Sequence, residues 1–72
     1  MDKQTQCKRI LEYMRRVGPI TRQDAMDYLS IANLTARIAD LRNDGHKIQT
    51  IMTKGVNKFG DKINYGRFML VE

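Results

Sequence analysis

The chain has 72 residues, and its 13 lysines and arginines against eight aspartates and glutamates give a formal net charge of +5. This length predicts a single domain over residues 1–72 with a small core, and the positive charge favours an anionic partner, of which nucleic acid is the commonest. A single cysteine excludes an internal disulfide, and the chain has neither a signal peptide nor an apolar run of about 20 residues, so we expect a cytoplasmic protein with no membrane partner.

A first helix is predicted from about residue 5 to residue 17. Its apolar side chains fall at i, i+3, i+4 and i+7 and form one stripe: Cys7, Ile10, Leu11 and Met14. Cys7 on this stripe is interpreted as a small core residue rather than a nucleophile. Gly18 and Pro19 end the helix, because glycine accepts a left-handed conformation and proline cannot continue a helix.

A second helix is predicted to begin after Thr21, which pairs with Asp24 three residues later in a capping-box arrangement. Ile20, just before it, either packs against the first helical turn or forms a one-residue strand. Three side chains are expected to face inward: Ala25, Tyr28 and Leu29.

A tight turn is expected over residues 29–32. Such a turn between two helices needs a residue in the left-handed conformation, where any side chain costs about 1–2 kcal/mol and glycine is usual. Ser30 is a departure from that pattern.

Asn33 is a good N-cap for a third helix that runs to about Asp44 before Gly45. The buried stripe of this helix is predicted to consist of Leu34, Ile38 and Leu41. The opposite face is predicted to carry Ala36, Ala39, Asp40 and Asn43, while Thr35, Arg37 and Arg42 flank the core. Two alanines on an outward face suit close approach to a bulky partner, although alanine is also simply the best helix former.

Two strands are predicted at residues 47–52 and 63–71, joined by a long loop over residues 53–62. Three lysines spaced by four lie in this loop: Lys54, Lys58 and Lys62. A hairpin with such a basic loop directly after the third helix is typical of a wing; the alternative is a solvated loop that its lysines keep soluble.

The order helix, helix, turn, helix, hairpin predicts an α+β winged helix-turn-helix with three helices and a two-stranded β-hairpin wing. The pattern IT..DA…L.I..L.ARI.DLR..G..I, followed by RFML near the end, resembles a family of small helix-turn-helix proteins frequent in bacteriophages and prophages. The resemblance covers nearly everything after Gln4, except that the wing loop of this chain has no counterpart in the family pattern. It implies a small transcriptional regulator that binds double-stranded DNA.

In that reading three groups of residues contact DNA. The first turns of the third helix enter the major groove, the start of the second helix holds a phosphate, and the wing contacts the backbone or the minor groove. In chain order the candidates are Thr21, Arg22, Gln23, Asn33, Thr35, Ala36, Arg37, Lys54, Lys58, Lys62 and Arg67. Arg37 is the candidate for guanine, with a structural ion pair to Asp40 or Asp44 as the alternative. Asn33 is the candidate for adenine, although its capping role competes.

No catalytic motif, metal-ligand spacing or cofactor motif is present, so we expect neither an enzyme nor a cofactor. The rival to DNA binding is a protein-interaction module, such as a phage adapter or inhibitor that binds a host protein. Its apolar contacts would come from Met26, Ile51, Val56, Phe59 and Ile63. Phe59 is the informative residue, since insertion into a partner pocket would favour the adapter and packing on the core would be neutral. A homodimer on repeated half-sites is left open, and RNA binding is a weaker option because no aromatic stacking platform is evident.

Overall fold

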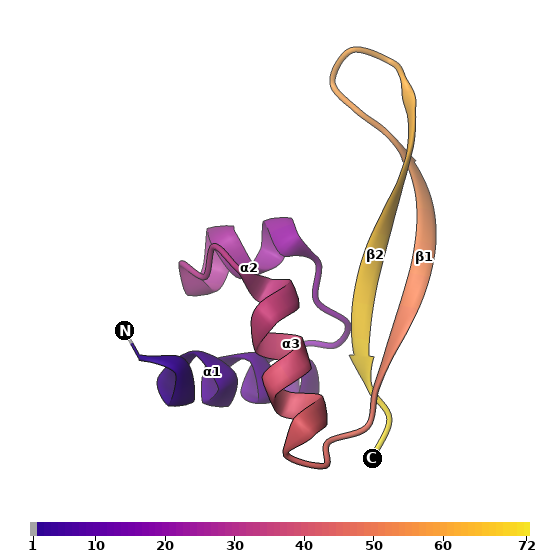
Figure 1. Ribbon diagram of the computed structural model, residues 1–72. Coiled ribbons are helices and arrows are strands. Elements are labelled where there is room, and N and C mark those ends of the chain that lie inside the picture. Colours follow the sequence, from indigo (N-terminus) through magenta and orange to yellow (C-terminus); the bar gives the residue numbers. More distant parts are fainter. Residues whose placement is uncertain (1) are drawn as a thin grey trace.

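The computed structural model describes residues 2–72, which form three helices followed by a two-stranded antiparallel sheet (Figure 1). The elements are α1 (Lys3–Arg16), α2 (Arg22–Leu29), α3 (Leu34–Asn43), β1 (Ile48–Val56) and β2 (Lys62–Leu70). This order confirms the predicted fold class. The described part of the chain measures 38 × 25 × 21 Å, and the hairpin extends well beyond the helices (Figure 1).

The core is apolar and draws on every element. Its buried members are Ile10, Met14, Ile20, Ala25, Ile31, Leu34, Ile38, Leu41, Ile48 and Phe68. The predicted stripe of α3 is therefore confirmed, while Cys7 and Leu11 of α1 are only partly buried at its edge. The inward placement of Tyr28 was wrong: its side chain is 70% exposed, and its ring stacks on Tyr13 with a centroid separation of 6.2 Å. In so short a helix only Ala25 and Leu29 reach the core.

Helix α1 begins earlier than predicted. Asp2 is its N-cap and accepts a hydrogen bond from the Thr5 amide at 2.7 Å, so the polar residues before Cys7 are already helical. The stripe of apolar residues could not reveal this turn because the turn carries none. The helix ends at Arg16, and Gly18 adopts φ +132° as its predicted role requires.

The turn between α2 and α3 is the predicted left-handed one, with Ser30 at φ 57° and ψ 37°. The Ser30 amide donates to the Met26 carbonyl at 3.2 Å and the Ile31 amide donates to the Ala25 carbonyl at 2.9 Å, so that two backbone hydrogen bonds close the helix end. At the other end of α2 the capping box is confirmed: the Asp24 amide donates to Thr21 Oγ1 at 3.0 Å, and the Thr21 amide donates to Asp24 Oδ2 at 3.1 Å.

The hairpin corrects the predicted loop. Strand β1 continues to Val56, paired with Lys62, so that only residues 57–61 form the turn. Gly55, which suggested a loop, lies inside the strand because the Tyr65 ring covers it: a Cβ built there would be 2.8 Å from Tyr65 Cε1. The glycine makes room for an aromatic ring to lie against the strand backbone, a role that the glycine alone does not reveal.

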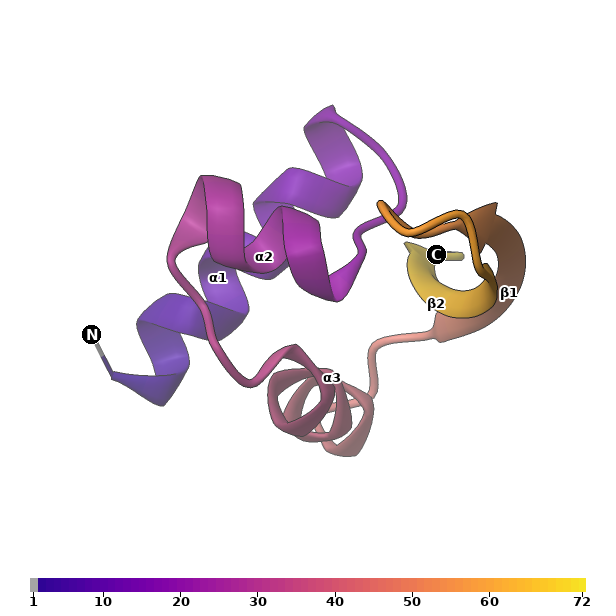
Figure 2. The same cartoon turned by 90° about the horizontal axis from the view of Figure 1, so that it is seen from above.

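Ile20 forms an isolated bridge with Phe68, with reciprocal amide-to-carbonyl hydrogen bonds of 2.9 Å. The one-residue strand was thus the correct alternative for Ile20. This bridge ties the linker before α2 to β2. Seen from above in Figure 2, α3 appears end-on beside the hairpin, so the two run alongside each other. No helix within residues 2–72 is long and apolar enough to cross a membrane.

Candidate nucleic-acid interface

The outward face of α3 consists of different residues from those predicted. Thr35, Ala39 and Asn43 are exposed, whereas Ala36 and Asp40 are half-buried. The prediction placed both of these opposite the core, but it did not account for α1, which packs against α3 on that side. The residues available to a partner are therefore a helical i, i+4, i+8 series of small side chains.

Arg37 lies on the same sheltered side. Its Nε is 3.0 Å from Asp40 Oδ2, and its side chain is only 16% exposed. The structural ion pair, rather than a free guanidinium, is the alternative that the structure shows. Nearby, the Cys7 thiol donates to the Arg37 carbonyl oxygen at 3.9 Å, and burial of the thiol raises its pKa.

Asn33 caps α3, as the competing role required, by accepting a hydrogen bond from the Ala36 amide at 3.3 Å through Oδ1. Asn33 and Thr35 are both exposed, and the cap uses only the Oδ1 of Asn33. The start of α3 therefore keeps a donor and a hydroxyl available to a partner.

Arg42 joins α3 to the base of the hairpin. Its Nε and Nη2 donate to the Ile48 carbonyl at 3.2 and 2.8 Å, and Nη2 also donates to Thr50 Oγ1 at 3.0 Å. Its guanidinium carbon lies 5.9 Å from the centre of the Phe68 ring. The helical pattern predicts only that Arg42 flanks the core. No local pattern marks it, because its acceptors belong to a strand whose position only the fold defines.

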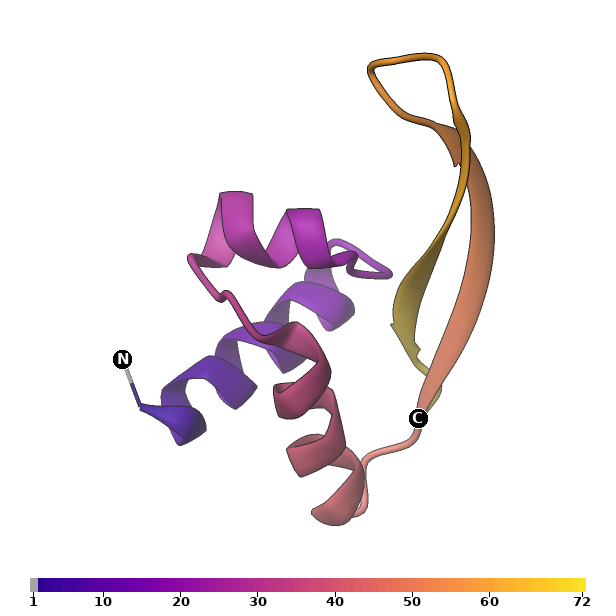
Figure 3. The ribbon, with the colours of Figure 1, turned by 45° about the horizontal axis from the view of Figure 1, so that its top comes forward.

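Figure 3 shows the first turn of α2 on the side of the helix that faces β2. A groove of about 630 Å³ lies between these two elements. The groove is lined by Thr21, Arg22, Gln23, Met26, Ala32, Ile63, Asn64, Tyr65 and Gly66. The Thr21 hydroxyl is used by the cap, so its contribution is to hold the helix start. The backbone amides of Arg22 and Gln23 lie in the first turn of α2, where no helical carbonyl lies four residues before them, so they stay available to an anion.

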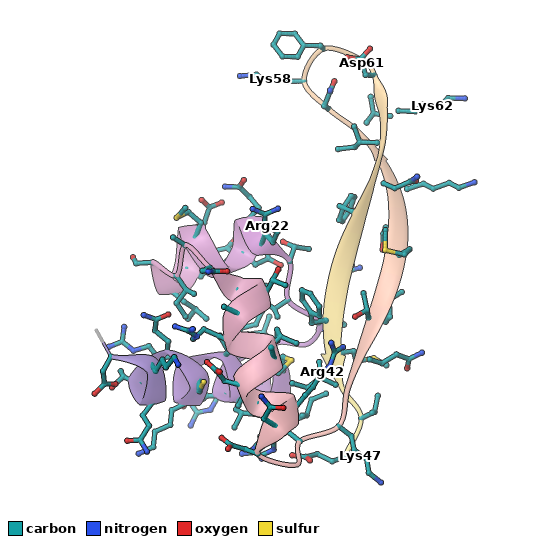
Figure 4. All side chains as sticks on the ribbon, viewed as in Figure 1. Arg22, Arg42, Lys47, Lys58, Asp61 and Lys62 are labelled. Carbon is teal, nitrogen blue, oxygen red and sulfur yellow. The ribbon has the colours of Figure 1, made fainter. Side chains whose placement is uncertain are left out.

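The three wing lysines are all exposed. Lys54 lies in β1 opposite Asn64, Lys62 begins β2, and Lys58 is in the turn. Figure 4 shows Lys58 and Lys62 projecting to opposite sides of the hairpin tip, with Arg22 at the start of α2 and Arg42 at the hairpin base.

Arg67 is not brought together with these lysines. Its side chain alternates to the other face of β2, its Nε is buried, and it lines a separate hollow with Tyr13 and Tyr28.

A family model described as a winged helix-turn-helix domain matches residues 5–72. The match spans all three helices and the hairpin, and the chain belongs to this family. No curated protein and no solved structure matches the chain.

Proposed function

We propose that this winged helix-turn-helix protein binds double-stranded DNA sequence-specifically and acts as a small phage-type transcriptional regulator. The observation that carries the proposal is the groove that the start of α2 and β2 form together, with Ala32 of the turn before α3 in its lining, beside a hairpin that carries three exposed lysines. Family membership supports DNA binding in general, while sequence reading and regulation rest on this arrangement.

The outward face of α3 suits the major groove. A helix with its side chains is about 10–12 Å across and the groove about 12 Å wide, so small outward residues allow close approach. Ala39 leaves the centre of the face flat, and Thr35 and Asn33 supply the polar groups for base edges at its N-terminal end. Arg37 is not assigned a base contact, since its guanidinium is held by Asp40.

The other two surfaces suit phosphates. The free amides of Arg22 and Gln23, with the positive end of the α2 dipole, form a site for one phosphate oxygen. The lysines of the hairpin extend the positive surface along a flanking stretch of backbone. Arg42 contributes by fixing the angle between α3 and the hairpin, so that both reach the same duplex.

The protein-interaction alternative, with a host protein as partner, also has an observation in its favour. Phe59 and Val56 at the hairpin end are 79% and 66% exposed, so neither packs on the core. An adapter would use these side chains and Met26 in place of the α3 face.

A single substitution separates the two functions. Ala39→Glu places a negative charge on the outward face of α3 and is expected to weaken binding to a mixed-sequence duplex by at least about tenfold, since like charges brought together cost several kcal/mol. Gln4→Glu makes the same charge change on an exposed position of α1 and is the matched control. Equal affinities of the two variants in a fluorescence anisotropy titration would remove α3 from the interface.

A further inference from the structure

The tip of the hairpin is a turn closed by hydrogen bonds of Asn57. Asn57 Oδ1 accepts hydrogen bonds from the Phe59 amide at 2.9 Å and from the Asp61 amide at 3.0 Å. The Asn57 amide donates to the Asp61 carbonyl at 3.0 Å, and Gly60 donates back to the Asn57 carbonyl at 3.0 Å while adopting φ +85°. Phe59 lies inside this turn, and its backbone amide is one of the donors in the network.

Phe59 is the most exposed large apolar residue within residues 2–72, at 79%. Its ring does not pack against the core, and the Nζ of Lys58 lies over it, 5.3 Å from the ring centre. Leaving a phenyl ring in water forgoes the burial that normally stabilises an aromatic side chain. A hydrogen-bonded turn that holds this ring outward at the far end of a long hairpin indicates a contact with another molecule.

The charges around Phe59 define the chemistry of that molecule. Residues 48–70 carry four cationic side chains against one acid, Asp61, which is a net charge of +3. The Asp61 carboxylate is 3.5 Å from the Asn57 side-chain nitrogen and belongs to the turn itself. Figure 4 shows Lys58 and Lys62 on opposite sides of the tip. This arrangement favours a partner that offers an apolar surface to Phe59 and a row of negative charges on each side of that surface.

We propose that Phe59 inserts as a wedge between base pairs in the minor groove and kinks the duplex, while Lys58 and Lys62 contact the phosphates on either side. Apolar side chains used in this way unstack a base step and bend DNA by about 20–90°. This inference rests on the proposed DNA binding and adds to it a specific act: the protein reshapes its site instead of only docking on it.

The hairpin is long enough for this contact. Nine residues of β1 rise roughly 27 Å from the Ile48 anchor held by Arg42 to Val56. Adjacent major and minor grooves are separated by about half a helical turn, or roughly 17 Å along the axis. With α3 in the major groove, the tip therefore reaches the neighbouring minor groove.

The test measures bending apart from binding. A mixed-sequence duplex containing easily unstacked TA steps is labelled with a donor and an acceptor at its two ends, and energy transfer is followed on titration. The wild type is expected to raise energy transfer. Phe59→Leu keeps an apolar wedge and should retain most of the rise, while Phe59→Ala should lose it but still bind in a salt-dependent way.

Tyr28→Ala removes another exposed aromatic ring, on α2, and is the matched control, expected to bend DNA like the wild type. Because Phe59 lies outside the core, circular dichroism of Phe59→Ala should match the wild type. Binding without bending, or equal bending by Phe59→Ala, would overturn the wedge while leaving DNA binding intact, and would assign Phe59 to a protein pocket. Absence of any DNA binding would overturn both proposals.

Discussion

Replacing Ser30 by glycine should stabilise the protein. Ser30 adopts φ 57° and ψ 37° at the end of α2, a conformation in which a Cβ is crowded by the following carbonyl. Glycine has no Cβ, and the backbone hydrogen bonds that close this turn, from the Ser30 and Ile31 amides, do not depend on the side chain. The substitution therefore removes strain and leaves the turn unchanged.

The magnitude follows from two opposing effects. Relief of the left-handed strain contributes about 1–2 kcal/mol, and the greater freedom of glycine in the unfolded chain takes back about 0.4–1 kcal/mol. The free energy of unfolding should rise by about 0.5–1 kcal/mol, which corresponds to an increase in Tm of about 2–8 °C for a chain of this size.

Thermal and urea unfolding followed by circular dichroism measure this difference. Ser30→Ala is the control, since it removes the hydroxyl but keeps the Cβ, and we expect no gain from it. A Tm for Ser30→Gly at or below that of the wild type, or an equal gain in Ser30→Ala, would refute the argument that backbone strain is stored at this turn.

Three further predictions concern the packed contacts. Arg42→Met keeps the aliphatic stem but removes the hydrogen bonds to the hairpin, and should lower stability by about 1 kcal/mol in urea unfolding while weakening DNA binding; full affinity would show that the hairpin needs no such anchor. The hydrogen bond from His46 lowers the pKa of Glu72, so this carboxylate stabilises the fold above its unfolded pKa and loses that effect as pH falls through the lowered value. Glu72→Gln should therefore have a lower Tm than the wild type near neutral pH, with the gap closing under acid; a gap independent of pH would contradict the assignment. Burial raises the pKa of Cys7, so its thiol should react with a disulfide reagent at pH 8 more slowly in the native protein than in urea, and equal rates would show that the site is open.

The helices could be predicted because their ends carry local chemistry. Thr21 with Asp24, and Asn33 alone, mark helix starts by hydrogen bonds to amides within three residues. The left-handed residue at Ser30 followed from the topology of the turn even though serine does not favour that conformation. Interactions this close in the chain are visible in the sequence itself.

The hairpin and the site were predicted less well because their determinants lie far apart in the chain. Gly55 belongs in a strand only because Tyr65 lies across from it, and Arg42 has a role only because Ile48 and Thr50 are placed beside α3. The position of Arg37 near the start of α3 predicted a base contact. In the structure α1 packs against that side of α3, and Arg37 is paired with Asp40. A helical wheel shows which residues share a face and does not show which neighbour covers that face.

The central claim is that the outward face of α3, the start of α2 and the hairpin together bind the DNA backbone and read one groove. Fluorescence anisotropy of the protein against a mixed-sequence duplex, repeated at several salt concentrations, tests it most directly. Five phosphate contacts predict a slope of log affinity on log salt of roughly −4.5, at about 0.9 per neutralised phosphate. A slope near zero, or no binding at low salt, would contradict the account and assign the exposed hairpin tip to a protein partner.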